Sequence, residues 1–222
     1  MVRVGPAVQG TFQVLDKLTS TVDNQIKITK VFLNAIKAAS IYFGKTFLPG
    51  VVAVLKPVDA IFCARRIFGK FPKIFSGVEF ADRGKWIPIV GGGNLPNHGF
   101  RGLGTICMGI ADIATTACWL IDKGVVALAK IASSMGVLES FKGPFAVTGS
   151  LLYMADVLFN SVVNRHFEII EFFKLAEHAL RISMIFCYGL GGGFVLHAAL
   201  SAFSSQAVGI TRIIVQTVRG RN

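Results

Sequence analysis

Charged side chains are scarce in this chain, and acidic ones are scarcest. Only 16% of its 222 residues are charged, whereas about 25% is usual for a soluble domain. Twelve acidic residues stand against twenty-three lysines and arginines, and 53% of the sequence is hydrophobic. So few charges cover the surface of a soluble domain poorly. The composition therefore indicates a chain that buries much of itself in lipid or in a partner, or an unusually apolar helical bundle.

The common signatures of catalytic, metal and redox sites are missing as well. No CxxC, HExxH, GxSxG or two-histidine-one-carboxylate spacing occurs, so the four histidines are interpreted as surface or cap residues. The four cysteines stand singly among apolar neighbours and are expected to be reduced core thiols; they are Cys63, Cys107, Cys118 and Cys187. We expect no enzyme, no metal and no cofactor.

Glycine is abundant, but its two clusters lack the patterns that bind phosphate. A dinucleotide fingerprint needs a glycine at its sixth position, where this chain has Pro96 in one cluster and Phe194 in the other. Neither cluster is followed by the Gly-Lys-Ser/Thr of a P-loop. The N-terminus also lacks the continuous apolar stretch of a cleavable signal peptide, so export would need another route.

Positive charge is concentrated in the first part of the chain. The formal net charge is +11, and residues 1–85 account for +8 of it, with thirteen basic and five acidic residues. A basic region on an apolar chain suggests anionic lipid or an acidic partner, although basic charge is also a simple means of staying soluble. Nucleic acid is an unlikely partner, because no helix-turn-helix, zinc-finger or RNA-recognition signature appears.

Apolar residues recur at helical spacing along most of the chain, so we predict an all-α, multi-helix bundle. Residues 23–45 form an amphipathic helix with a basic stripe of Lys27, Lys30 and Lys37. Residues 51–75 form a second helical stretch, with a start or kink near Pro57. Phenylalanines alternate there with four basic residues, namely Arg65, Arg66, Lys70 and Lys73. This stretch suits a membrane interface, or equally a core-facing helix with a solvated basic back.

Residues 76–102 form the one long irregular region, with seven glycines and two prolines. The chain is therefore divided into a basic helical region, 1–75, a loop or hinge, 76–102, and an apolar helical region, 103–222. A short strand over 86–90 is conceivable.

Isolated acids interrupt the apolar helices of the last region. Asp112, Asp122 and Asp156 are either buried functional carboxylates or markers of solvent-facing helix surfaces. Further on, Glu171 with Lys174 and Glu177 with Arg181 have the spacing of ion pairs within a helix.

Residues 182–211 contain no charged side chain, and this stretch of thirty residues is long enough for a membrane span. The stretch contains a glycine cluster, Gly189, Gly191, Gly192 and Gly193. These glycines favour close helix packing in a membrane or a membrane-like environment, and the alternative is a glycine-broken pair of buried helices.

Several stretches resemble the chlamydial class I accessible protein family, whose members are helical and linked to the inclusion membrane. They are "VDNQIKITK", "VDAIFCARRIFGKF" and "TGSLLYMADVLFNSVV", followed by a hydrophobic C-terminal region. The resemblance implies type III secretion and residence at the inclusion membrane. The paired spanning helices of many inclusion proteins are not evident here.

A second resemblance is to the peroxisomal membrane-elongation peroxins. It rests on an early "DKL" amphipathic helix, the basic "ARRIFGKF" segment and the glycine-rich C-terminal stretch. It implies insertion of a basic helix, within 16–45 and 64–73, into one leaflet and bending of the membrane. From all of this we expect a non-enzymatic, membrane-associated helical protein that binds anionic lipid and an unidentified protein partner. The alternative is a soluble helical oligomer; homo-oligomers are compatible with both.

Overall fold

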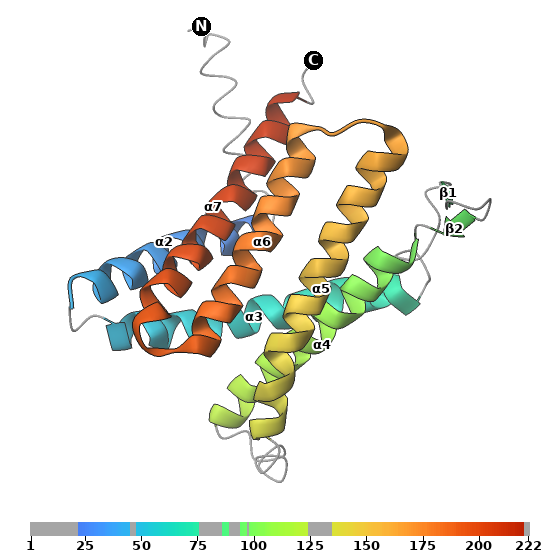
Figure 1. Ribbon diagram of the computed structural model, residues 1–222. Coiled ribbons are helices and arrows are strands. Elements are labelled where there is room, and N and C mark those ends of the chain that lie inside the picture. The colour runs from blue at the N-terminus through green and yellow to red at the C-terminus, as the bar shows by residue number, and fades with distance from the viewer. Residues whose placement is uncertain are drawn as a thin grey trace, which may run out of the picture.

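Six long helices make up almost all of the described part of the chain in the computed structural model (Figure 1). The structure describes residues 22–44, 48–75, 86–88, 94–96, 98–123 and 135–219. The helices are α2 (Val22–Tyr42), α3 (Leu48–Phe75), α4 (His98–Asp122), α5 (Met135–Asn164), α6 (Ile169–Leu190) and α7 (Val195–Arg219). The prediction of an all-α bundle is confirmed. The second predicted helix is continuous through Pro57.

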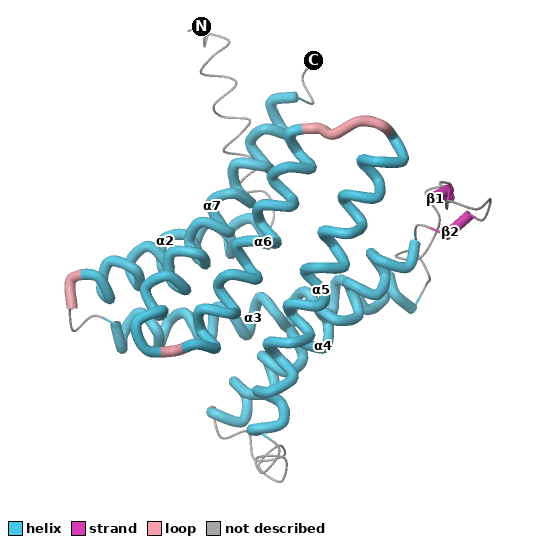
Figure 2. Tube along the Cα trace, in the orientation of Figure 1, coloured by secondary structure: helices cyan, strands magenta, loops and turns pink. Residues whose placement is uncertain are grey.

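Each helix packs against the next along the chain, and the last packs against the first. The order of neighbours is α2, α3, α4, α5, α6, α7 and again α2, with the closest association between α4 and α5 and between α6 and α7. Figure 2 shows α5, α6 and α7 side by side, with α2 and α3 crossing them at a steep angle. The basic region 1–75 therefore contributes two helices, α2 and α3, to the same helical body as the apolar region.

Most of the predicted hinge, 76–102, lies outside the described residues. The exceptions are two short strands, β1 (Trp86–Pro88) and β2 (Asn94–Pro96), and the first turn of α4. The strands pair antiparallel, with Ile87 opposite Leu95. The strand that the sequence suggested within 86–90 is thus present, but helix α4 begins four residues earlier than the predicted loop ends.

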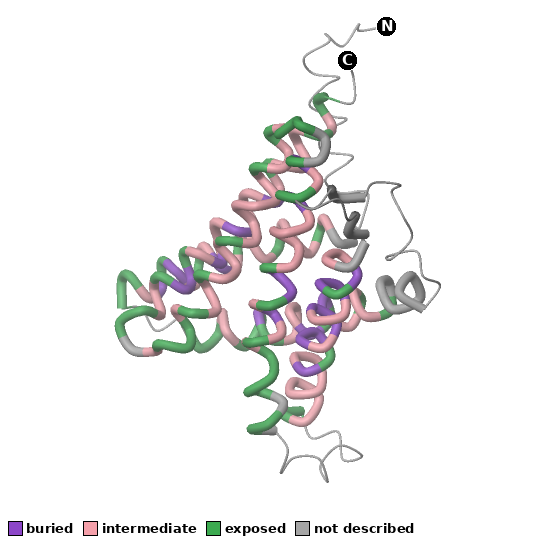
Figure 3. The backbone as a smooth tube through the Cα atoms, turned by 45° about the vertical axis from the view of Figure 1, so that its right-hand side comes forward, coloured by how far each residue is buried: buried purple, intermediate pink, exposed green. Residues whose placement is uncertain are grey.

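Small side chains fill the interior of the bundle. Alanine is the commonest buried residue, and the largest side chains that are almost fully buried are Met108, Thr105 and Ser150. Figure 3 shows the buried positions as short segments along the faces where helices meet. Among the described residues, twenty-four large hydrophobic side chains are exposed, and nine of them are phenylalanines. Exposed apolar surface of this extent is unusual for a monomeric soluble domain.

Glycines permit the close approach of α4 and α5. A Cβ atom added at Gly104 would lie 3.3 Å from the backbone oxygen of Gly149 and 3.3 Å from Leu152 Cβ. At Gly149 it would lie 2.7 Å from Met108 Cγ and 3.1 Å from the backbone oxygen of Gly104. Neither position has room for a side chain, so these two residues set the distance between the helices.

The glycine cluster singled out in the sequence forms a turn. Helix α6 ends at Leu190, Gly191 has φ +63°, and a short 3₁₀ helix, η2 (Gly192–Phe194), leads into α7. An added Cβ would meet no atom within 4 Å at Gly189, Gly191 or Gly193. Within the described part of this single chain, these three glycines therefore do not bring helices close together. Gly191 supplies a backbone conformation that side chains disfavour, and the chain breaks there between α6 and α7.

Candidate functional site

A buried ion pair joins α3 to α4 at the centre of the bundle. The guanidinium of Arg66 donates a hydrogen bond to the Asp112 carboxylate, and the two side chains are only 14% and 5% exposed. The same guanidinium lies 3.7 Å from Cys63 Sγ. Burial lowers the pKa of Arg66, but the charge of Asp112, the neighbouring Cys63 and the hydrogen bonds to both together outweigh it, so the net pKa shift is upward. Arg66 therefore stays charged, and Asp112 is the buried carboxylate that one interpretation of the sequence foresaw.

Helix α2 is attached to α3 by Lys30. Its ammonium group forms an ion pair with Asp59 and lies 4.7 Å from the centre of the Phe62 ring. Arg66 also lies over that ring, at 4.5 Å. Phe62 is thus in contact with two cations, an arrangement that stabilises each of them through the electron-rich face of the ring.

Glu177 of α6 connects the helices on the other side of the bundle. Its carboxylate lies 3.1 Å from Arg212 Nη2 of α7 and 3.8 Å from Lys27 Nζ of α2. Its backbone oxygen accepts a hydrogen bond of 3.0 Å from Ser205 Oγ. A Cβ atom added at Gly209 would lie 3.4 Å from the Glu177 carboxylate. The absence of a side chain at Gly209 therefore leaves room for this carboxylate. Glu177 is therefore shared between two basic residues of neighbouring helices.

Arg181 lies among these pairs without an ion pair of its own. Its side chain is half-buried and feels the charges of Arg66, Asp112 and Glu177, yet among the described residues no ion pair joins it to either carboxylate. The predicted ion pair with Glu177 is absent, whereas that between Glu171 and Lys174 is present at 4.0 Å. Burial lowers the pKa of Arg181, and the neighbouring Arg66 lowers it further.

We refer to these residues together as the central charge cluster. It comprises five basic and three acidic side chains from five helices, namely Lys27, Lys30, Arg66, Arg181, Arg212, Asp59, Asp112 and Glu177. Ion pairs inside an apolar protein hold their partners strongly, because removal of one member leaves the other charged and buried.

A smaller polar group links α4, α5 and α6 beside this cluster. Thr105 Oγ1 and the Tyr153 hydroxyl are 2.7 Å apart, and the Tyr153 ring stacks on His178 with 5.2 Å between centres. His166 is exposed beside Glu168, and His197 is exposed beside Phe194. No group of three metal-ligating side chains occurs among the described residues.

The basic stripe predicted on the first helix contacts neighbouring helices. Besides Lys27 and Lys30, Lys37 donates a hydrogen bond to the Tyr188 hydroxyl and lies 4.6 Å from the ring centre. On α3 Arg65 is exposed while Arg66 is held in the interior. The side chains of Lys70 and Lys73 lie outside the description. A lipid-binding role of these residues stays a prediction; the structure assigns four of them to contacts within the chain.

The sequence offered only a partial signal for this cluster. Asp112 stood out as an acid inside an apolar helix, but nothing in the sequence paired it with Arg66, forty-six residues away. Asp122 is exposed and contacts Lys56 at 3.3 Å, as expected for a solvent-facing acid. All four cysteines are free; Cys63 is buried and the other three are half-buried.

The chain matches no protein-family model, no curated protein and no solved structure. Its function is therefore argued from its surface and its interior.

Proposed function

We propose that this chain is a non-enzymatic membrane protein, whose helical body is embedded in lipid and acts through contacts with lipid and with a protein partner. The observation that carries the proposal is the distribution of side chains among the described residues. The buried positions are mostly alanine and polar residues, whereas twenty-four large apolar side chains are exposed. In lipid no hydrophobic force drives large apolar side chains inward, and helices associate through small residues and interhelical polar contacts.

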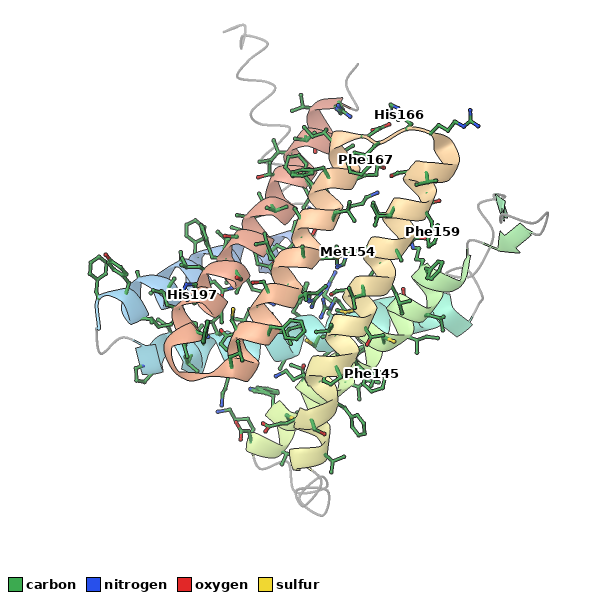
Figure 4. All side chains as sticks on the ribbon, in the orientation of Figure 1. Phe145, Met154, Phe159, His166, Phe167 and His197 are labelled. Carbon is green, nitrogen blue, oxygen red and sulfur yellow. The ribbon has the colours of Figure 1, made fainter. Side chains whose placement is uncertain are left out.

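In the part of the chain that the structure describes, three helices are long and apolar enough to cross a bilayer: 100–122 in α4, 139–162 in α5 and 195–219 in α7. Half of the first candidate span is buried in the protein, but only 22% of the second and 28% of the third. Most residues of the α5 and α7 spans are therefore at least partly accessible from outside the protein. Phe159 and Phe167, labelled in Figure 4, are among the exposed aromatic residues of α5 and of the turn that follows it.

The central charge cluster is compatible with this environment. Charged residues within membrane proteins face the interior of the helix bundle and pair with one another. Asp112 lies inside a candidate span and meets Arg66, and Arg212 lies inside another and meets Glu177. The glycine contact between α4 and α5 supports the same proposal, because glycines that let backbones approach closely are typical of helix interfaces in membranes.

The compartment and the cellular role rest on the sequence resemblances alone. On the chlamydial resemblance, we propose a type III-secreted protein at the inclusion membrane. On the peroxin resemblance, the alternative is membrane remodelling at the peroxisome. The membrane lipid that we propose as the partner is anionic, because the chain carries a formal net charge of +11. A soluble oligomer, with its exposed apolar surfaces covered by other copies, is the competing account.

Extraction from membranes separates these accounts. We expect the full-length protein to float with liposomes in a density gradient and to remain with them after washing at alkaline pH in carbonate, because apolar helices in the bilayer are held by hydrophobic burial. Release by carbonate would indicate a peripheral protein. Failure to float at all, with a large oligomer in the soluble fraction, would contradict membrane association.

A further inference from the structure

The turn between α5 and α6 lies where the three candidate spans of the described chain meet one end of the bundle. The α5 span ends three residues before Arg165. Phe100, the first residue of the α4 span, stacks on Phe159 of α5 with 5.0 Å between ring centres. Arg219, the last residue of the α7 span, lies 3.2 Å from Glu168 of the turn. In the membrane protein proposed above, this turn therefore lies at one surface of the bilayer.

Arg165 is an exposed cation on this turn. The two carboxylates that follow it in the sequence are engaged by other basic residues, Glu168 by Arg219 at 3.2 Å and Glu171 by Lys174 at 4.0 Å. Among the described residues, no ion pair includes Arg165. The positive charge of Arg165 is therefore available to a partner outside the chain.

The backbone at Arg165 suits glycine better than arginine. Its φ is +51°, and in the described part of the chain it is the one residue other than glycine with a positive φ. The Arg165 N–H donates to the Val162 oxygen and the His166 N–H to the Ser161 oxygen, each at 3.1 Å, as at helix ends where glycine is usual. Glycine would adopt this conformation without a steric cost. The stability of the turn therefore does not account for an arginine at this position.

Large apolar side chains surround this cation. Val162 and Phe167 stand on either side of Arg165 in the sequence, and their side chains are 71% and 51% exposed. Phe167 is labelled on the turn in Figure 4. Ile169 and Phe172, at the start of α6, are exposed as well. An arginine among exposed apolar and aromatic residues at the end of a span is typical of the boundary between lipid acyl chains and headgroups.

We propose that the α5–α6 turn is a contact for anionic phospholipid, with Phe167 at the acyl boundary and the Arg165 guanidinium on the headgroup phosphate. This inference rests on the proposed function and gives its anionic lipid a position on the chain. The planar donors of a guanidinium match the oxygens of a phosphate. An anionic lipid suits Arg165 better than a choline lipid, because no choline cation offsets its phosphate charge. The basic stripe on α2 is less suited to this role, because its three lysines contact neighbouring helices.

Lipid-selective fluorescence quenching tests this contact in the whole chain. Both native tryptophans are replaced, by Trp86→Phe and Trp119→Phe, and a reporter is introduced by Phe167→Trp. The protein is reconstituted in phosphatidylcholine liposomes to which phosphatidylglycerol or phosphatidylcholine, brominated near the headgroup end of its acyl chains, is added. We expect both brominated lipids to quench the reporter. The relative affinity should be about fivefold higher for phosphatidylglycerol, the size expected for one basic side chain near an anionic surface.

Variants make the result specific to Arg165. Arg165→Gly should remove the preference for phosphatidylglycerol and keep or raise the thermal unfolding midpoint in detergent, because the backbone conformation suits glycine. Arg165→Lys keeps the positive charge and should retain most of the preference. Lys142→Gln is the matched control, because exposed Lys142 lies near the opposite end of α5. A reporter introduced instead by Leu151→Trp, at an exposed position within the α5 span, should be quenched equally by the two lipids.

A preference at position 167 that requires a basic residue at position 165 supports the contact. Equal quenching by the two lipids at position 167 overturns it, as does a preference that survives Arg165→Gly or is lost equally in Lys142→Gln. A lower unfolding midpoint of Arg165→Gly also overturns it, since the arginine would then serve the fold. Quenching at position 151 but not at position 167 would place the turn outside the bilayer; the contact would fail and the proposed function would stand. Quenching at neither position would contradict both, because the helices would not lie in lipid.

Discussion

Replacing Asp112 by asparagine is expected to lower the free energy of unfolding by about 3–5 kcal/mol. The amide preserves the shape of the side chain but removes the negative charge that faces Arg66. Arg66, whose side chain is 14% exposed, would remain charged in the interior without its partner. The measurement is unfolding in uncharged detergent, by heat or by added sodium dodecyl sulfate.

Asp122→Asn is the matched control for this prediction. Asp122 also contacts a basic side chain, Lys56 at 3.3 Å, but the two side chains are 47% and 62% exposed. Exposed ion pairs contribute about 0–1 kcal/mol, so this variant should be close to wild type. The double variant Arg66→Met with Asp112→Leu should regain much of the lost stability, because no charge is left buried. Equal losses for Asp112→Asn and Asp122→Asn would show that the central pair is not buried as described.

Gly149→Leu is expected to separate α4 from α5 and to lower the free energy of unfolding by about 1–3 kcal/mol. Leucine has the higher helix propensity, so the loss would occur against the local preference of the backbone. The physical reason is contact: even a Cβ at this position lies 2.7 Å from Met108 Cγ and 3.1 Å from the backbone oxygen of Gly104.

Two further variants separate packing from propensity. Gly136→Ala lies in the same helix, where an added Cβ meets nothing within 4 Å, and it should be neutral or slightly stabilising. Gly149→Ala should be destabilising in the wild type and should cost less in a Met108→Ala background, because the smaller side chain vacates the space that the new Cβ needs. If Gly149→Leu were as stable as the wild type, the described α4–α5 contact would be wrong.

Helical periodicity sufficed to predict the class of the fold and the approximate positions of the helices. It did so because the apolar faces of α2 and α6 repeat every three to four residues, a local property of the sequence. The boundaries were less accurate at glycine and proline. Pro57 lies within an unbroken helix, and Gly189 is helical while Gly191 is not. The difference between those two glycines is a matter of backbone conformation, with φ +63° only at Gly191.

The interior was less predictable, because its contacts join residues that are distant in sequence. The basic stripe on α2 reads as a surface when that helix is considered alone, but Lys27 reaches Glu177 on α6, and Lys37 reaches Tyr188. The glycines that pack helices together were also hard to predict from the sequence. The cluster near residue 190 drew attention by its density, whereas the glycines that pack helices together, Gly104 and Gly149, are single residues on two helices.

The most direct test of the central claim, that the outer apolar surface faces lipid, is the environment of spin labels on that surface. One label is placed on each candidate span, at exposed Ile113, Leu151 or Leu200, in protein reconstituted in liposomes and with its four native cysteines replaced by alanine. Exposed Arg165, between α5 and α6, is the control. The account predicts that the three labels are accessible to oxygen and not to a water-soluble nickel chelate, whereas the label at Arg165 is accessible to the chelate. Accessibility of all three to the chelate, or protection of all three from both reagents, would contradict it, since the surface would then face water or another protein.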